Sequence, residues 1–196
     1  TPTFSDGVTY HAVIGKITIP ANVTSFTVTV ASTEDTIDEA DETYDLSVGG
    51  VDATGTITDD DAAPTVSTVT SATEAEGDNL VHTVTLSNAA STPREYDFSL
   101  TGDTATLGTD FNGTPTFSDG VTYDSGAGEI TVPANVTSFT VTVASIEDGL
   151  HESNETYDLV VGGQSTTGTI LDDESAPILT IDNVEVSEGS DAVFDV

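Results

Sequence analysis

The sequence predicts an all-β protein made of tandem antiparallel Greek-key β-sandwiches of immunoglobulin-like type. Apolar and polar residues alternate with a period of two, and no segment shows the periodicity of a helix. Turn residues such as Asn112-Gly113 and Gly162-Gly163 separate the alternating segments. The third observation is an internal repeat about as long as one such domain, which fits an array of independent sandwiches.

The alternating segments place the predicted strands. In the segment from Phe139 to Val143, apolar residues face one side and Thr140 and Thr142 face the other. About seven segments of this kind fall within roughly 110 residues, as in a sandwich domain. The clearest of them lie at residues 84–86, 95–100, 139–143 and 157–161, and residues 26–30 in the partial first repeat show the same alternation as 139–143.

Self-comparison shows the repeat directly. Thr1–Tyr10 recurs unchanged at Thr114–Tyr123, and Pro20–Ser32 recurs unchanged at Pro133–Ser145, both with an offset of 113 positions. The repeat is therefore one domain long, which is too long for a leucine-rich or ankyrin unit.

The phase of the repeat predicts three segments. Residues 1–61 match the C-terminal half of a repeat, residues 62–174 form one complete repeat, and residues 175–196 match the N-terminal start of the next. Because an unfinished sandwich exposes a sheet edge and half a core, we expect the sequence to be a window on a longer polypeptide. Pro64 and Pro177 lie at the predicted junctions, where short proline-containing linkers favour a stiff array.

The charge balance limits the classes of partner. The formal net charge is −33, because Lys16 and Arg94 are the only lysine and arginine against 35 acidic residues. Such a chain would be repelled by nucleic acids and by anionic membranes. The absence of cysteine excludes disulfides and thiolate metal sites, and no apolar run is long enough to cross a membrane. Composition alone leaves two interpretations of the acidity, a solubilising surface or ligands for a hard cation.

The acids are concentrated in four places of the complete repeat, where loops of a sandwich are expected. These are Glu76, Asp110, the acids within residues 147–155 and those within residues 172–174. Like charges this close destabilise a compact fold unless a cation neutralises them. A single acidic pair is most simply a solvated loop, but four clusters that recur wherever the repeats can be compared favour a metal. Calcium suits them, because it takes six to eight oxygen ligands in flexible geometry.

Five segments, taken in order, resemble the Calx-beta domain, which is known from sodium–calcium exchangers and from large bacterial surface proteins. The segments are the Glu76-Gly77 step, Thr104–Phe111 with its GTDF sequence, Gly128–Val143, Ile146–Leu159, and Thr167–Glu174 with its terminal acids. The resemblance covers essentially the whole repeat. It implies a calcium-binding sandwich whose metal pole lies where the chain leaves for the next domain, so that bound ions would stiffen the junction.

The resemblance also implies the ligands. In that family they come from the early Glu, the Asp of the GTD segment, the acids of the long loop and the terminal acidic triplet. In the complete repeat the matching residues are Glu76, Asp110, Glu147, Asp148, Glu152, Glu155, Asp172, Asp173 and Glu174. In the partial repeats they are Glu34, Asp35, Glu39, Glu42, Asp59, Asp60, Asp61 and Glu188. The sequence departs from the family at Glu147, where Asp is commoner, and at Glu174, which replaces the Asp found at Asp61.

We expect these repeats to be calcium-stiffened extenders of a long adhesin or filament protein, secreted or on a bacterial cell surface. The alternative is a calcium-dependent module that binds a glycan or a protein, although the chain lacks the tryptophan that glycan stacking favours. A cadherin-like sandwich is the alternative fold. Near-identical copies suit a spacer, and no nucleophile–base set recurs, so an enzyme is not expected. The expected partners are neighbouring repeats, with a cell-surface glycan or protein bound by other regions; nucleic acid and membrane insertion are not expected.

Overall fold

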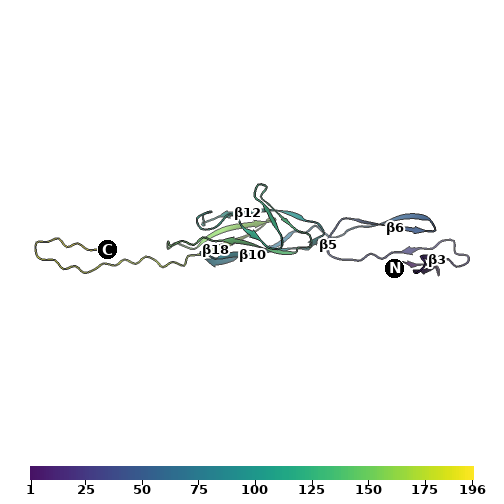
Figure 1. Cartoon of the computed structure of the whole chain (residues 1–196), viewed down its shortest axis with the longest axis horizontal. Coiled ribbons are helices and arrows are strands. Elements are labelled where there is room, and N and C mark those ends of the chain that lie inside the picture. The colour runs from purple at the N-terminus through teal and green to yellow at the C-terminus, as the bar shows by residue number, and fades with distance from the viewer. The chain divides into compact units, whose positions relative to one another are not determined.

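The computed structural model describes residues 1–196, and its regular structure consists entirely of strands (Figure 1). The predicted all-β class is confirmed. The chain forms two compact units, one made of Thr1–Thr36 and Ala40–Asp60 and the other of Ile37–Glu39 and Asp61–Val196. We call them unit 1 and unit 2. No helix in the structure is long and apolar enough to span a bilayer.

Unit 2 is a two-sheet sandwich. The smaller sheet has the order β13-β16-β10-β8, and the larger has the order β14-β15-β12-β17-β18-β9. The bounds of the smaller sheet's strands are β8 Val66–Val69, β10 Asn79–Leu86, β13 Thr116–Phe117 and β16 Ser138–Ala144. Those of the larger sheet are β9 Ala72–Ala75, β12 Arg94–Gly102, β14 Thr122–Asp124, β15 Glu129–Val132, β17 Glu155–Val161 and β18 Gln164–Leu171. Apart from the parallel β18–β9 pair, the neighbouring strands of these two sheets run antiparallel.

The core lies between the two sheets, and the period-two alternation explains which side chains fill it. Every second residue of β16, namely Phe139, Val141 and Val143, is buried, as are Tyr157, Leu159 and Val161 of β17. Burying each large apolar side chain contributes roughly 1.5–3 kcal/mol. The predicted strands at residues 84–86, 95–100, 139–143 and 157–161 therefore lie within β10, β12, β16 and β17, for the physical reason that predicted them.

One buried polar pair joins the two sheets of unit 2. His82 of β10 is fully buried, and its Nε2 atom lies 2.8 Å from the Tyr157 hydroxyl of β17. Its Nδ1 atom lies 2.7 Å from the Thr70 carbonyl oxygen. Nδ1–H therefore donates to the carbonyl, and Nε2 accepts from the tyrosine. Burial lowers the pKa of His82, so this side chain is a satisfied, neutral part of the core.

Unit 1 contains three two-stranded ladders. They are β1 (Thr3–Phe4) with β4 (Val28–Thr29), β2 (Thr9–His11) with β3 (Lys16–Thr18), and β6 (Glu42–Val48) with β7 (Val51–Ile57). The predicted strand at residues 26–30 shortens to the two residues of β4. Its counterpart β16 is longer because β10 and β13 pair with its two edges, whereas β4 pairs with β1 alone.

Two further segments belong to unit 2. The short strand β5 (Ile37–Asp38) pairs in parallel with β11 (Ala89–Ala90), and the buried Asp38 forms an ion pair with Arg94. Residues 175–196 form no strand, and several of their apolar side chains, such as Ile178 and Leu179, are exposed. The assignment of this segment to the start of another repeat stays a prediction, as do the other two repeat boundaries.

Candidate metal centre

The parallel pairing of β9 and β18 creates the acidic end of unit 2. Ala75 pairs with Leu171 at the last position of both strands, so the residues that follow leave the sheet side by side. Those residues are Glu76 and Asp172, and the Glu76 amide donates to the Leu171 carbonyl oxygen at 3.1 Å. A parallel pair therefore places carboxylates that are nearly 100 positions apart in the sequence at one edge.

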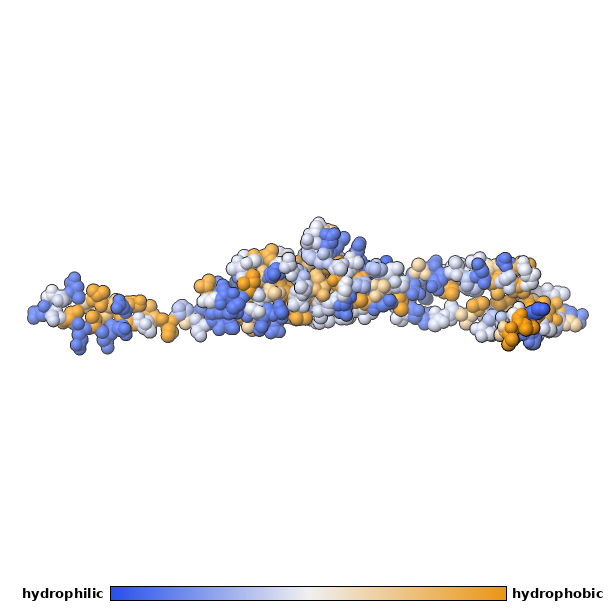
Figure 2. Space-filling view, viewed as in Figure 1, coloured by the Kyte–Doolittle hydropathy of each residue, from blue (hydrophilic) through white to orange (hydrophobic).

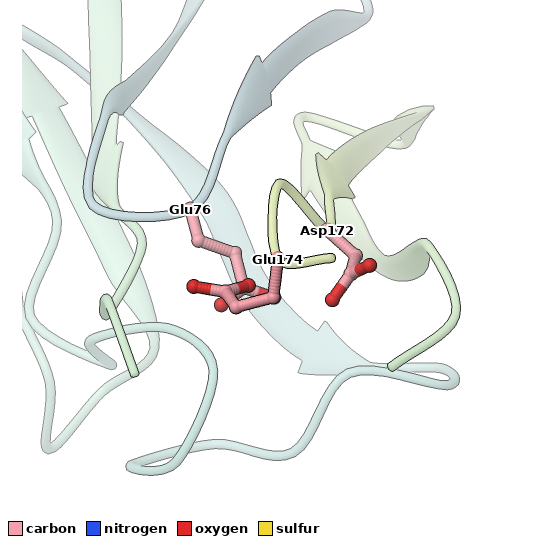
Figure 3. A group of neighbouring side chains, drawn as sticks. All are labelled: Glu76, Asp172 and Glu174. Atoms are coloured by element: carbon pink, nitrogen blue, oxygen red, sulfur yellow. The ribbon is translucent and has the colours of Figure 1, made fainter. Parts of the chain in front are cut away.

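The first acidic group consists of Glu76, Asp172 and Glu174. One carboxylate oxygen from each lies within 4.8 Å of the other two. Figure 3 shows Glu76 reaching from the loop after β9 toward Glu174, which follows Asp172 beyond the end of β18. All three side chains are half-buried.

Two more groups share this geometry. Glu147 and Asp173 form one together with Glu174, so Glu174 belongs to two groups that adjoin. Asp110, Glu152 and Glu155 form the other. Backbone bonds connect the loops that carry them: Ile146 donates to the Asp110 carbonyl oxygen at 2.9 Å, and Ser145 donates to that of Asp78 at 3.1 Å.

The long loop at residues 146–154 is anchored on Asp172. The Glu152 amide donates to one Asp172 carboxylate oxygen at 2.7 Å, and Nδ1 of His151 contacts the other at 2.7 Å. These bonds, the Glu152 amide first, lower the pKa of Asp172 although burial opposes them. The Asp172 amide in turn donates to the Asn154 side-chain oxygen at 3.3 Å. Asp172 is thus held as an anion in a fixed position.

Three glutamates of the site resist ionisation, because the pKa of each is raised. Burial raises the pKa of Glu76 to about 6, and the negative charges of Glu174 and Asp148 add to the rise. Burial, followed by a hydrogen bond with Asp110 and that residue's charge, raises the pKa of Glu155 to about 7. Burial and the charges of Asp173 and Glu147 raise the pKa of Glu174. Three acids are therefore costly to ionise where no cation stands among them.

The donor set fits a hard divalent cation. Oε2 of Glu174 is buried and has no hydrogen-bond partner, although it belongs to the residue that joins two groups. A buried acceptor without a partner is rare and needs a compensating contact. Since all the side-chain donors are carboxylates, calcium or magnesium suits them, and the flexible, oxygen-rich coordination of calcium suits a crowded set best.

Most of the acids predicted in the complete repeat come together here. Eight of the nine lie in the three groups. Asp148 is the exception, and its carboxylate accepts a hydrogen bond from the Leu150 amide at 2.7 Å. The three groups contain none of the acids predicted in the partial repeats: Glu34, Asp35, Glu39, Glu42, Asp59, Asp60, Asp61 and Glu188. The assignment of all these acids as ligands stays a prediction.

Sequence reasoning missed the two residues that position Asp172. His151 has no histidine counterpart in the first repeat, so nothing in the sequence marked it. Asn154 had a signal in the sequence, since Asp41, 113 positions earlier, also carries a side-chain oxygen that can accept a hydrogen bond. In the structure Asp41 accepts from the Asp59 amide at 3.1 Å, as Asn154 accepts from the Asp172 amide. The same contact 113 positions earlier shows that this loop anchor belongs to the repeat.

Fold and site together define a β-sandwich domain with acidic groups at one end that could hold a metal ion. The Calx-beta domain family matches residues 3–72 and 59–184, and the chain belongs to this family. The Calx-beta domain is a calcium-binding β-sandwich module, of the binding or structural kind rather than an enzyme. The family resemblance predicted from the sequence is confirmed.

Several solved structures are similar to the chain at low identity. The crystal structure of CBD12 from CALX1.2 is 20% identical, with a TM-score of 0.44 over 57% of this chain and 45% of that one. The apo-form Calx CBD1 domain is 21% identical, with a TM-score of 0.40 over 53% of this chain and 89% of that one. The S-layer protein rSbsC(31-844) is 14% identical, with a TM-score of 0.32 over 93% and 21%. The chain thus spans under half the length of CBD12 from CALX1.2. No curated protein matched the sequence.

Proposed function

We propose that unit 2 binds calcium at its acidic pole, and that such repeats serve as calcium-stiffened spacers in a long cell-surface or secreted protein. One observation carries the proposal. Acidic residues form three groups of three, in each of which one carboxylate oxygen per residue lies within 4.8 Å of the other two, and two of the groups share Glu174. Glu174 also holds the buried oxygen that lacks a partner.

The residues of each group define what calcium would join. Glu76, Asp172 and Glu174 would connect the ends of β9 and β18, and Glu147 with Asp173 would add the start of the long loop. Asp110 and Glu155 would tie the loop before β13 to the start of β17. Calcium supplies positive charge that neutralises these acids, so loops that repel one another become cross-linked.

The stiffening follows from the position of the pole. Asp172, Asp173 and Glu174 are the residues that lead out of β18 into Ser175-Ala176-Pro177. Ions held by these three acids would restrain the backbone at the start of the linker, and Pro177 further limits its conformations. Neighbouring repeats of the same chain are therefore the proposed partners.

The proposed extracellular location sets the affinity that we expect. Extracellular calcium modules bind with dissociation constants of about 10⁻⁴–10⁻³ M, which suits millimolar calcium outside cells. The glycan-binding alternative gains no support from residues 61–174, because none of the large hydrophobic side chains exposed there is aromatic.

The test is calcium titration of the full chain by calorimetry, with thermal melts in calcium and in chelator. We expect calcium to bind and to raise the melting temperature. Glu76→Gln should weaken binding, whereas Glu74→Gln is the matched control, because Glu74 is exposed two residues earlier on β9. Equal titrations for the two variants, or a melt indifferent to calcium, would remove the basis of the proposal.

A further inference from the structure

A three-residue segment of the chain is docked on unit 2. Residues Ile37–Glu39 belong to unit 2, although the residues on both sides of them in the sequence belong to unit 1. In this segment β5 pairs in parallel with β11, and the Ser91 amide donates to the Asp38 carbonyl oxygen at 2.9 Å. The Ser91 hydroxyl donates to the same oxygen at 3.3 Å. Backbone bonds therefore fix the segment to unit 2.

An ion pair completes the docking. The Asp38 carboxylate is paired with Arg94, which is the only arginine of the chain. The side chain of Asp38 is only 11% exposed, and a carboxylate buried to this extent is costly unless it is paired. An arginine at the docking site therefore favours a segment that carries an acid at this position, because complementary charge determines which partner fits.

The docking site lies at the opposite end of the sandwich from the acidic pole. β12 begins at Arg94, and Gly102 at its other end pairs with Tyr157, two residues after Glu155 of the pole. At about 3.3 Å per residue, the eight positions from Arg94 to Gly102 span roughly 26 Å. Figure 2 shows hydrophilic residues gathered at the end of the sandwich from which β18 leads toward the C-terminus, and Figure 1 labels β5 at the other end. Two different, complementary ends are what a head-to-tail array requires.

The equivalent loop position of the complete repeat has a different partner. His151 lies 113 positions after Asp38, and its Nδ1 atom contacts the Asp172 carboxylate of its own pole at 2.7 Å. Asp38 cannot make the same contact, because the residue equivalent to Asp172 is Asp59, which is another acid. A histidine at this position is therefore held by its own pole, whereas an aspartate is held by Arg94.

We propose that β11, Ser91 and Arg94 form a docking site for the long loop of the preceding repeat, and that an acid at the position of Asp38 determines this docking. The docked loop tethers consecutive repeats without calcium. It adds to the proposed spacer function but does not rest on calcium binding, because neither Asp38 nor Arg94 belongs to the three acidic groups.

The first test is hydrogen exchange at the Ser91 amide, followed by NMR in the full chain with chelator present. This amide should be protected in the parent chain, because it donates to Asp38. Asp38→Asn and Asp38→His should each speed its exchange by at least about 10-fold, because the segment opens more often. Both changes leave the strands of the two sheets of unit 2 intact. Asp52→Asn is the matched control, because Asp52 is an exposed acid on β7, and it should change nothing.

The arginine is tested in the same way. Arg94→Gln should speed exchange at Ser91 as the Asp38 variants do, and Arg94→Lys should restore part of the protection, because it keeps the charge without the fork of donors. Lys16→Gln removes the other lysine or arginine charge of the chain, and it should leave Ser91 protected. Partial rescue by lysine separates the ion pair from a loss of packing at β12.

Nitrogen-15 relaxation in chelator tests the tether itself. The rotational motion of β6 and β7 should become faster in Asp38→His and stay unchanged in Asp52→Asn. The proposal is overturned if Ser91 exchanges equally fast in the parent chain and the Asp38 variants, if its protection appears only with calcium, or if relaxation is the same in all the chains. Calcium titration of unit 2's pole is a separate measurement, so failure of either proposal is distinguishable from failure of the other.

Discussion

Replacing Glu174 by Gln should stabilise the folded chain in chelator and destabilise it, relative to the parent chain, in calcium. The substitution removes one charge but keeps the size of the side chain. In chelator, Glu174 stands among Glu76, Glu147 and Asp173, and its own pKa is raised by burial and by its neighbours. Removing that charge relieves repulsion, so the variant should melt above the parent chain when no divalent cation is present.

In calcium the order should reverse. At an extracellular-type dissociation constant of roughly 10⁻⁴ M, calcium at about 10 mM stabilises the folded state by about 2.7 kcal/mol for each ion bound. If each of the three groups holds one ion, Glu174 contributes to two of them. The calcium-induced rise in melting temperature should therefore fall to about a third of the rise in the parent chain.

The assay is differential scanning calorimetry of the full chain, with and without calcium, on Glu174→Gln and on Glu95→Gln. Glu95 is an exposed acid on β12 outside the three groups, so its variant controls for the loss of one negative charge. The reasoning would be refuted if calcium raised the melting temperatures of the two variants by the same amount. It would also be refuted by a Glu174 variant that melts below the parent chain in chelator.

Three other predictions concern pH and the core. In chelator the free energy of unfolding, measured by urea titration, should fall as pH rises from about 5 to about 7.5. The reason is that the raised pKa values of Glu76 (about 6) and Glu155 (about 7) keep protons bound in the folded state that the unfolded chain has already released. Saturating calcium should abolish the fall. Tyr157→Phe should cost about 1–3 kcal/mol in the same titration, because Nε2 of the buried His82 loses its donor; an unchanged midpoint would contradict the pairing. Gly168→Ala should destabilise unit 2 by about 1–3 kcal/mol or more, since an added Cβ would lie 2.1 Å from the Tyr157 ring, whereas Gly163→Ala, with open space around it but a positive φ of 81°, should show backbone strain alone.

The sheet faces were predictable from sequence because burial imposes a period of two. Phe139, Val141 and Val143 alternate with threonines, and the structure buries all three. The parallel β9–β18 pair was not predictable, because β9 is only four residues long and its partner lies far along the chain. Sequence patterns show which face a strand buries, but they do not show which distant strand lies beside it.

For the candidate site, the sequence predicted which acids take part but not how the loops arrange them. Repetition and the family resemblance selected acids, and eight of the nine in the complete repeat lie in groups that could hold a cation. Asp148 lies outside the groups, and its carboxylate accepts a hydrogen bond from the Leu150 amide, a detail of loop geometry that the sequence does not show. His151 was missed for the same reason, since only the folded loop brings its ring to Asp172. Loop conformation therefore sets the limit of the sequence argument.

The acidic pole of unit 2 draws on both halves of the predicted complete repeat. Glu76 and Asp110 belong to the first half, whereas the other acids of the three groups come from the second half. Unit 1 keeps the loop anchor between Asp59 and Asp41. Two of the three groups draw on both halves, so calcium at these groups would join the half-repeats to each other as well as stiffen the exit. Calcium bound at the pole and the packed sandwich of unit 2 would then stabilise each other.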